Sequence, residues 1–149
     1  MNTLRHEEVA EAAKEEYSEQ VTALANHLGI GKQEIEQSTY DDDVYEADGA
    51  EYLVIDDDAA TDRAYEYIKD TLWAFNSEFL ANFTYLPVEE FEALQPQCES
   101  ANDAIEKIIG NKFKRFADTA IATDGRGHFM SSYDGEENFC MDFYIYRTN

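Results

Sequence analysis

The stretch EYLVIDDDAATDRAYEYIKDTLWAF, residues 51–75, decides the fold, because a strand pattern runs directly into a helix pattern. Residues 52–55 form a short apolar run between acids, which is typical of a buried strand. Asp57 or Asp58 can then cap a helix over residues 59–75. The apolar face of that helix recurs at helical spacing and consists of Ala64, Tyr65, Ile68, Leu72 and Phe75. A strand followed by a helix indicates a sheet packed by helices.

The N-terminal segment is predicted to form one amphipathic helix over residues 5–28, with Thr3 as its N-cap and Gly29 as its end. Its apolar residues fall on one face at helical spacing. The opposite half of the helix carries the acids Glu7, Glu8, Glu11, Glu15 and Glu19. We therefore expect a long surface helix with an acidic outer side.

The remaining segments complete an α+β pattern. Short helices are expected over residues 78–83 and 88–94, and a longer one over residues 102–121. Gly110-Asn111 can break the longer helix, because Lys112 would otherwise intrude on its apolar face. Residues 31–50 are interpreted as a polar stretch with a short helical turn near residues 33–37.

The C-terminal end is predicted to be a β-hairpin. Residues 128–132 and 139–146 have strand-like composition, and the turn-forming pair Asp134-Gly135 lies between them. The expected fold is therefore α+β, with amphipathic helices packed on a small sheet of about three strands that ends in this hairpin. The length of 149 residues fits a single domain over residues 1–149.

The net charge of the chain is the feature that most needs a functional explanation. The chain has 33 acidic and 11 basic residues, a net charge of −22, and yet 44% of its residues are hydrophobic. That apolar content excludes a disordered acidic tail. A net charge of about 2–8 is enough to keep a small domain in solution. Because the excess destabilises the folded chain through self-repulsion, we expect a function that requires it.

Other classes of protein are disfavoured by what the sequence lacks. There is no apolar run long enough to cross a membrane, and the acidic N-terminal segment is unlike a secretory signal. Cys98 and Cys140 are too few for a disulfide framework or a zinc site. We expect reduced thiols in a cytoplasm, no metal, no cofactor and, because no catalytic motif is recognisable, no enzymatic activity.

The acids are concentrated in one part of the chain. Eleven acidic residues and no basic residue lie between Glu34 and Asp58. Carboxylates one helical turn apart are about 5–6 Å from each other, and duplex DNA carries one charge per about 1.7 Å of its axis. An acidic helix face together with an acidic loop can therefore imitate a ladder of phosphates.

Three segments of the chain resemble a group of small acidic proteins encoded by tailed bacteriophages. They are DGRGHFMSSYDGEEN from Asp124, YIYRTN at residues 144–149, and IKDTLWAFNSEFL from Ile68. The resemblance covers roughly residues 50–149. It implies a bacterial cytoplasm during infection, and it assigns no role to any residue.

Together these features predict an acidic DNA-mimic inhibitor of the anti-defence class, such as an anti-CRISPR or anti-restriction protein. It would bind the basic, nucleic-acid-binding surface of a host protein, without binding nucleic acid or a membrane itself; a homodimer stays open. Two tyrosines in the acidic loop are the expected partner-contact aromatics. The predicted partner-binding residues are Glu7, Glu8, Glu11, Glu15, Glu19, Tyr40, Asp41, Asp42, Asp43, Tyr45, Glu46, Asp48, Asp56, Asp57 and Asp58.

Two alternatives remain open. Asp56, Asp57 and Asp58 follow the central strand, where carboxylates can hold Mg²⁺ or Mn²⁺ in a small metal-dependent enzyme. Helix capping and solvent exposure explain the same three residues more simply. The second alternative is a non-catalytic phage accessory protein whose acidity serves only solubility or salt adaptation.

Overall fold

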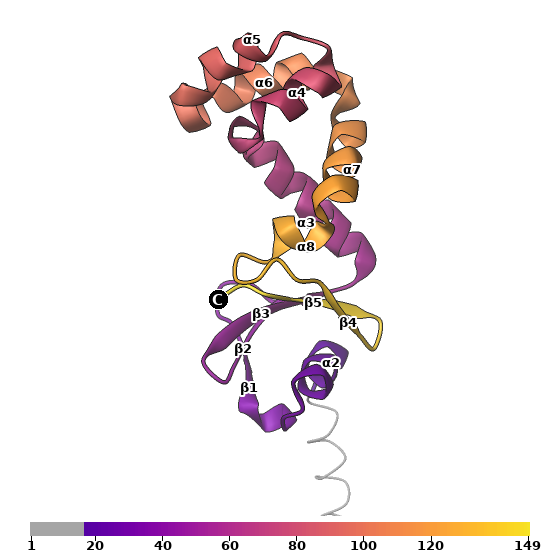
Figure 1. Cartoon of the computed structure of the whole chain (residues 1–149). Coiled ribbons are helices and arrows are strands. Elements are labelled where there is room, and N and C mark those ends of the chain that lie inside the picture. Colours follow the sequence, from indigo (N-terminus) through magenta and orange to yellow (C-terminus); the bar gives the residue numbers. More distant parts are fainter. Residues whose placement is uncertain (1–16) are drawn as a thin grey trace, which may run out of the picture. The chain divides into compact units, whose positions relative to one another are not determined.

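The computed structural model describes residues 17–149, which divide into two compact units (Figure 1). In the described part of the chain, unit 1 consists of residues 17–60 and Ser131–Asn149, and unit 2 of Thr61–Met130. Unit 1 contains the sheet and unit 2 is helical. The single domain expected from the chain length stays a prediction.

The sheet of unit 1 has five antiparallel strands, in the order β1-β2-β3-β5-β4. The strands are β1 (Ile35–Gln37), β2 (Val44–Ala47), β3 (Ala50–Ile55), β4 (Asn138–Cys140) and β5 (Phe143–Arg147). The α+β class and the C-terminal hairpin are confirmed, and the predicted strand at residues 52–55 lies within β3, at the centre of the sheet. The expected number of about three strands is wrong.

The two additional strands come from the segment that the sequence suggested was a polar stretch. A 3-10 turn at Lys32–Glu34 is followed by β1, so the helical turn expected near residues 33–37 is confined to its first part. β2 and β3 are joined by Asp48 and Gly49, whose φ angles are 53° and 78°. Two successive residues with positive φ are what a tight two-residue hairpin requires. Val44, Tyr45 and Ala47 are buried in β2, which explains why this acidic segment forms a strand.

The C-terminal hairpin has a different turn from the one predicted. β4 and β5 pair across Met141 and Asp142, whose φ angles are 52° and 70°. Residues 128–132 are not a strand, because the short helix α8 (Arg126–Met130) occupies this part of the chain. Asp134 lies in a turn before β4, where its Oδ1 accepts hydrogen bonds from the Ser131 hydroxyl and the Glu136 N–H, both at 2.9 Å.

Helix α2 (Glu19–Leu28) covers one face of the sheet (Figure 1). Ser18 is its N-cap, with Oγ accepting the Val21 N–H at 3.2 Å, and Gly29 ends it in the left-handed conformation, as predicted. Because Ser18 has an extended backbone, the predicted helix over residues 5–28 is not continuous. Thr3 and residues 5–16 lie outside the described residues. The core between α2 and the sheet consists of Val21, Leu24, Ala25, Ile35, Tyr45, Ala47, Val54 and Ile145.

Unit 2 is built from helices around a core rich in phenylalanine. The helices are α3 (Asp57–Asp70), which begins in unit 1 and continues into unit 2, α4 (Ser77–Thr84), α5 (Val88–Leu94), α6 (Asn102–Ile109), α7 (Phe113–Asp124) and α8. Phe116 is fully buried, and its ring contacts those of Phe75, Phe79 and Phe83 at centroid distances of 5.1–5.4 Å.

Several sequence predictions for unit 2 are confirmed. Helices α4 and α5 match the two predicted short helices to within one residue at each end. The predicted break at Gly110-Asn111 separates α6 from α7, and Gly110 has a φ of 58°. Within residues 17–149, no helix is long and apolar enough to cross a membrane.

Candidate functional site: an acidic face of the sheet

The charge of the chain is divided unequally between the two units. The described part of unit 1 holds 16 acidic residues and two basic residues, Lys32 and Arg147, for a net charge of −14. Unit 2 holds 12 acidic and seven basic residues, for a net charge of −5. Arg147 is also engaged within the unit, because its guanidinium lies 3.7 Å from the centre of the Tyr133 ring. The negative charge of the described residues is therefore concentrated on unit 1.

Three glutamates form a row across three neighbouring strands of the sheet, which we call the glutamate row. Glu36 of β1 is opposite Glu46 of β2, and Glu46 is opposite Glu51 of β3. Residues that are directly opposite in a sheet project from the same face. Tyr45 and Val54 in the same strands point to the core under α2. Because side chains alternate along a strand, the glutamate row projects from the other face of the sheet.

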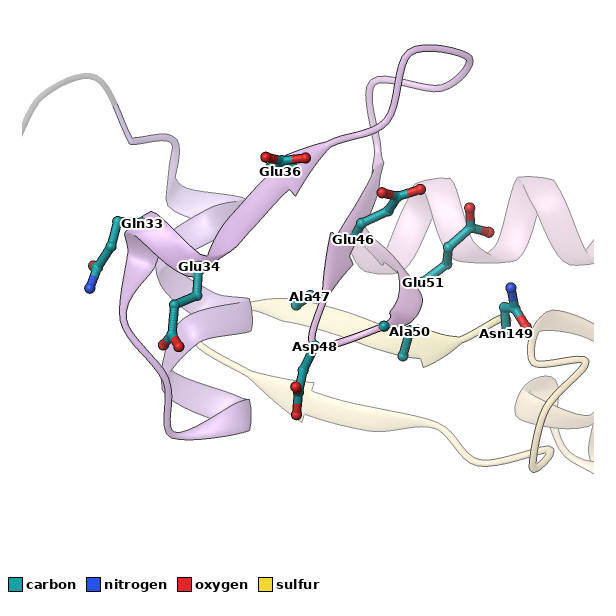
Figure 2. Close-up of a pocket in the computed structure, with 10 residues that line it drawn as sticks. Gln33, Glu34, Glu36, Glu46, Ala47, Asp48, Ala50, Glu51 and Asn149 are labelled. Carbon is teal, nitrogen blue, oxygen red and sulfur yellow. The ribbon is translucent and has the colours of Figure 1, made fainter.

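A shallow hollow of about 520 Å³ lies beside the glutamate row (Figure 2). Its lining adds Glu34, Asp48 and Asn149 to the three glutamates. Figure 2 shows the side chains of Glu46 and Glu51 pointing in one direction, and those of Glu34 and Asp48 pointing in the opposite one. Five carboxylates thus border this end of the sheet, and none of the described residues that line the hollow is basic.

Tyr40 connects the acidic loop to the glutamate row. Its hydroxyl donates a hydrogen bond to Glu51 Oε2 at 2.9 Å, while 67% of the residue remains exposed. This hydrogen bond to a carboxylate is the main reason that the pKa of Tyr40 is raised above its ordinary value, since it favours the protonated phenol. Tyr40 is therefore placed as predicted, on the surface and next to carboxylates.

The three aspartates after Tyr40 are partly used to build the loop before β2. Asp41 Oδ1 accepts the N–H of Asp43 at 2.9 Å, and Asp43 Oδ1 accepts a hydrogen bond from the Gln20 side chain at 2.9 Å. Asp41 and Asp43 are half-buried, whereas Asp42 is exposed. Of the three, Asp42 is the one whose carboxylate faces solvent most fully.

Tyr45 does not belong to the surface, and the prediction that it contacts a partner is wrong. Only 2% of it is exposed, because β2 directs it into the core under α2. Its hydroxyl donates to Gln20 Oε1 at 3.0 Å, and the Gln20 amide donates to the Val54 carbonyl at 2.7 Å. Tyr45 and Gln20 hold α2 on the sheet.

A second hollow, of about 490 Å³, gathers three predicted residues from distant parts of unit 1. Glu19 at the start of α2, Asp43 in the loop and Asp56 after β3 all line it. Asp56 also caps α3, since its Oδ1 accepts the Ala59 N–H at 2.8 Å. This corrects the predicted caps Asp57 and Asp58, which lie in the first turn of α3 and are exposed.

The structure gives little support to a metal centre at these aspartates. Between residues 17 and 149, no three His, Cys, Asp or Glu residues lie in an arrangement that could hold a metal ion. Carboxylates in the first turn of a helix are stabilised by the helix dipole. Asp56, Asp57 and Asp58 are therefore accounted for by capping and by the start of α3.

The predicted set of partner-binding residues lacks three acids that border the acidic hollow, and it includes four acids outside the described residues. Glu34, Glu36 and Glu51 border the acidic hollow and were not selected. The signal for them was the pair Asp48-Gly49 between two alternating segments, which predicts a hairpin and hence a common face for Glu46 and Glu51. Glu7, Glu8, Glu11 and Glu15 lie outside the described residues.

The chemistry available at this face is the binding of cations. Ionised carboxylates only accept hydrogen bonds, and Lys and Arg are their strongest side-chain donors. Comparisons with known protein families, with curated proteins and with solved structures gave no match.

Proposed function

We propose that this chain is an acidic inhibitor that occupies the nucleic-acid-binding surface of another protein in the place of DNA or RNA. The observation that carries the proposal is the glutamate row, in which Glu36, Glu46 and Glu51 stand side by side at matched positions of three strands. Such an arrangement is unfavourable in the isolated protein, because like charges directly opposite each other destabilise a sheet.

The geometry of the row suits a surface that normally binds phosphates. Neighbouring strands are about 4.7–4.9 Å apart, so carboxylates on successive strands recur at a spacing of that order. A rigid sheet fixes this spacing in advance, and a partner's Lys and Arg side chains then meet a preformed series of anions. Binding of cations would relieve the repulsion among Glu36, Glu46 and Glu51. The unfavourable pairing in the free protein would therefore favour complex formation.

The charge of the rest of unit 1 supports the same proposal. Its described residues carry a net charge of −14 with only two cations, so its field has one sign over a wide surface. A field of this kind speeds association with basic surfaces and repels nucleic acid itself. Tyr40 adds an exposed aromatic ring beside the row, and exposed tyrosines often anchor protein interfaces.

The class of partner follows from the resemblance to phage-encoded acidic proteins. A phage protein with this surface would act on a DNA-handling or defence protein of its bacterial host, at a one-to-one ratio and without turnover. Acidity that serves only solubility would not require glutamates to be paired across strands, since the same charges could be dispersed over both units.

Competition with DNA tests the proposed function directly. The proteins of a bacterial lysate that bind DNA-cellulose are applied to the immobilised chain, and the retained proteins are eluted with duplex DNA. We expect a retained protein that duplex DNA releases and that higher salt also releases. Retention that duplex DNA leaves unchanged, or no retention at low salt, would contradict the proposal.

A further inference from the structure

Unit 2 contains a hollow whose lining differs in kind from the acidic surfaces of unit 1. Its volume is about 480 Å³, within the range of pockets that bind small ligands. Four aromatic residues line it, namely Tyr67, Trp73, Phe75 and Phe129, together with Asp124 and His128. We call this hollow the aromatic pocket. All of its lining residues belong to unit 2.

The walls of the aromatic pocket are held in place by ring contacts. Phe129 is only 8% exposed, and its ring centroid lies 6.0 Å from that of Phe75 and 6.4 Å from that of Tyr67. Phe75 in turn packs against the buried Phe116 at 5.1 Å. Because these rings are anchored to the core of unit 2, the pocket is formed before any ligand arrives.

Among the described residues that line the aromatic pocket, Asp124 is the one acidic residue and none is Lys or Arg. It lies at the C-terminal end of α7 and is exposed. Three neighbouring polar side chains have contacts of their own. Asn76 Oδ1 accepts the N–H groups of Glu78 and Phe79, Thr71 donates to the Tyr67 carbonyl, and the His128 ring packs edge-on against Phe129 at a centroid distance of 4.9 Å. The pocket therefore offers aromatic rings and one carboxylate.

We propose that the aromatic pocket binds the guanidinium group of an arginine side chain. The faces of aromatic rings carry negative electrostatic potential and attract cations. A guanidinium is planar and weakly hydrated, so it can stack on such faces and also pair with a carboxylate through two parallel hydrogen bonds. The ammonium group of lysine is more strongly hydrated and cannot stack, which favours arginine as the ligand.

Arginine side chains already pack over aromatic rings within this chain. The guanidinium of Arg147 lies 3.7 Å from the ring centre of Tyr133, and that of Arg115 lies 5.3 Å from the ring centre of Phe83. In the aromatic pocket the rings are present, and none of the described residues that line it is an arginine. The inference stands apart from the proposed function, because the glutamate row belongs to unit 1 and contributes nothing to this lining.

Trp73 provides a probe for the test, since it is the one tryptophan of the chain and lines the aromatic pocket. The full-length chain is titrated with N-acetyl-arginine methylamide, and both Trp73 emission and the Trp73 indole N–H resonance are followed. We expect a saturable change in at least one of them. The matching citrulline compound, which is uncharged and of similar shape, should bind at least about tenfold more weakly because it lacks the charge-assisted pair.

Variants locate the binding to the aromatic pocket. Asp124→Asn should weaken binding of the arginine compound by about tenfold, whereas Asp62→Asn, which removes a charge from an exposed position of α3, should leave it within about twofold. Tyr67 is 51% exposed, so Tyr67→Ala should keep the fold and weaken binding, and Tyr67→Phe should bind like the unaltered chain.

The outcomes that overturn the inference are equally definite. They are the absence of a saturable change in both readouts, equal binding of the citrulline compound, or equal effects of Asp124→Asn and Asp62→Asn. The binding of free arginine is measured as a further comparison. If it binds more tightly than the blocked compound, an arginine within a polypeptide is not the ligand, because a polypeptide lacks the free α-amino and α-carboxyl groups.

Discussion

Glu46 of β2 lies directly opposite Glu51 of β3, and Glu36 of β1 lies opposite Glu46 on its other side. Glu46 is thus the middle carboxylate of three, with a like charge on each neighbouring strand. Glu51 accepts a hydrogen bond from the Tyr40 hydroxyl, whereas no hydrogen bond or ion pair of the Glu46 side chain is present in the part of the chain that the structure describes. Glu46 is therefore the position at which the repulsion is most simply measured.

Glu46→Gln is expected to stabilise the protein. Removing the central charge of the glutamate row relieves two unfavourable cross-strand pairs, so the free energy of unfolding should rise by about 0.2–1 kcal/mol. Urea unfolding at low ionic strength measures the change. The gain should shrink at about 1 M salt, where the Debye length falls to about 3 Å.

Glu66→Gln is the matched control for this substitution. Glu66 is an exposed residue of α3 and has no partner on a neighbouring strand. Its neutralisation changes the net charge of the chain by the same amount. An equal gain in both variants would show that the total charge, and not the pairing of Glu46, is what destabilises the fold.

At two helix ends with left-handed backbones, introducing a glycine and removing one should have opposite effects on stability. Gly29 after α2 and Tyr85 after α4 both have left-handed backbones, with φ angles of 69° and 60°. Tyr85 is 87% exposed, so Tyr85→Gly should raise the free energy of unfolding by about 1 kcal/mol through relief of backbone strain. Gly29→Ala should lower it by a similar amount, since the added Cβ meets no neighbouring atom and only the conformation is penalised.

Thermal and urea unfolding of the two single variants check this pair of predictions. A loss of stability in Tyr85→Gly would mean that the exposed ring of Tyr85 contributes contacts that outweigh its strained backbone. That result would make the corner between α4 and α5 a packed feature of unit 2.

The pH dependence of stability should include a contribution from Asp118 in α7. Its carboxylate accepts hydrogen bonds from the Tyr65 hydroxyl and from Lys114 Nζ, the latter at 3.0 Å, and these contacts lower the pKa of Asp118 below its ordinary value. A lowered folded-state pKa stabilises the protein above the unfolded-state pKa, and this contribution is lost as the pH falls through the folded-state pKa. The destabilisation caused by Asp118→Asn should therefore be largest above about pH 4 and should vanish at lower pH.

Carboxyl NMR titration tests the cause of this shift. In Tyr65→Phe the hydrogen bond from the phenol is absent, and the pKa of Asp118 should rise toward its ordinary value. If Asp118 titrates at the same pH in Tyr65→Phe as in the unaltered chain, the tyrosine hydroxyl is not the main cause.

The elements that the sequence predicted well have patterns that depend on local residues alone. The apolar run at residues 52–55 became part of β3, and the break at Gly110-Asn111 separates α6 from α7 as its glycine suggested. The α+β class follows from such segments, since each one needs only its own periodicity to be recognised.

The elements that were missed depend on partners distant in the chain. β1 is only three residues long, and its pairing with β2 is what makes it a strand. The C-terminal hairpin turns at Met141-Asp142, and methionine seldom adopts positive φ, so the sequence favours the more typical turn pair Asp134-Gly135. The sequence places Tyr45 at the surface because the acids around it obscure the alternation of apolar and polar residues in β2, which directs Tyr45 inward.

The composition of residues 34–58 shows that this region is acidic, but it does not show which carboxylates lie next to each other in the fold. Charge alone groups Asp41 and Asp43 with Glu46 and Asp48, although the Asp41 carboxylate accepts a hydrogen bond within the loop and the Asp43 carboxylate accepts one from Gln20 of α2. The cross-strand register that unites Glu36, Glu46 and Glu51 depends on which strands pair, and that information is distributed over the whole sheet.

We propose that the position of the carboxylates, and not their number, determines partner binding. Two variants with equal net charge test it: Glu36→Gln/Glu46→Gln/Asp48→Asn on the acidic face of the sheet, and Glu66→Gln/Glu92→Gln/Glu99→Gln at exposed positions of unit 2. Their affinities are measured, over a range of salt concentrations, for a bacterial DNA-binding protein that the chain retains and duplex DNA releases. We predict that the first variant loses at least about tenfold in affinity and has a shallower salt dependence, while the second stays within about twofold. Equal losses in both variants, or an affinity that does not change with salt, would show that the arrangement of Glu36, Glu46 and Asp48 does not determine binding.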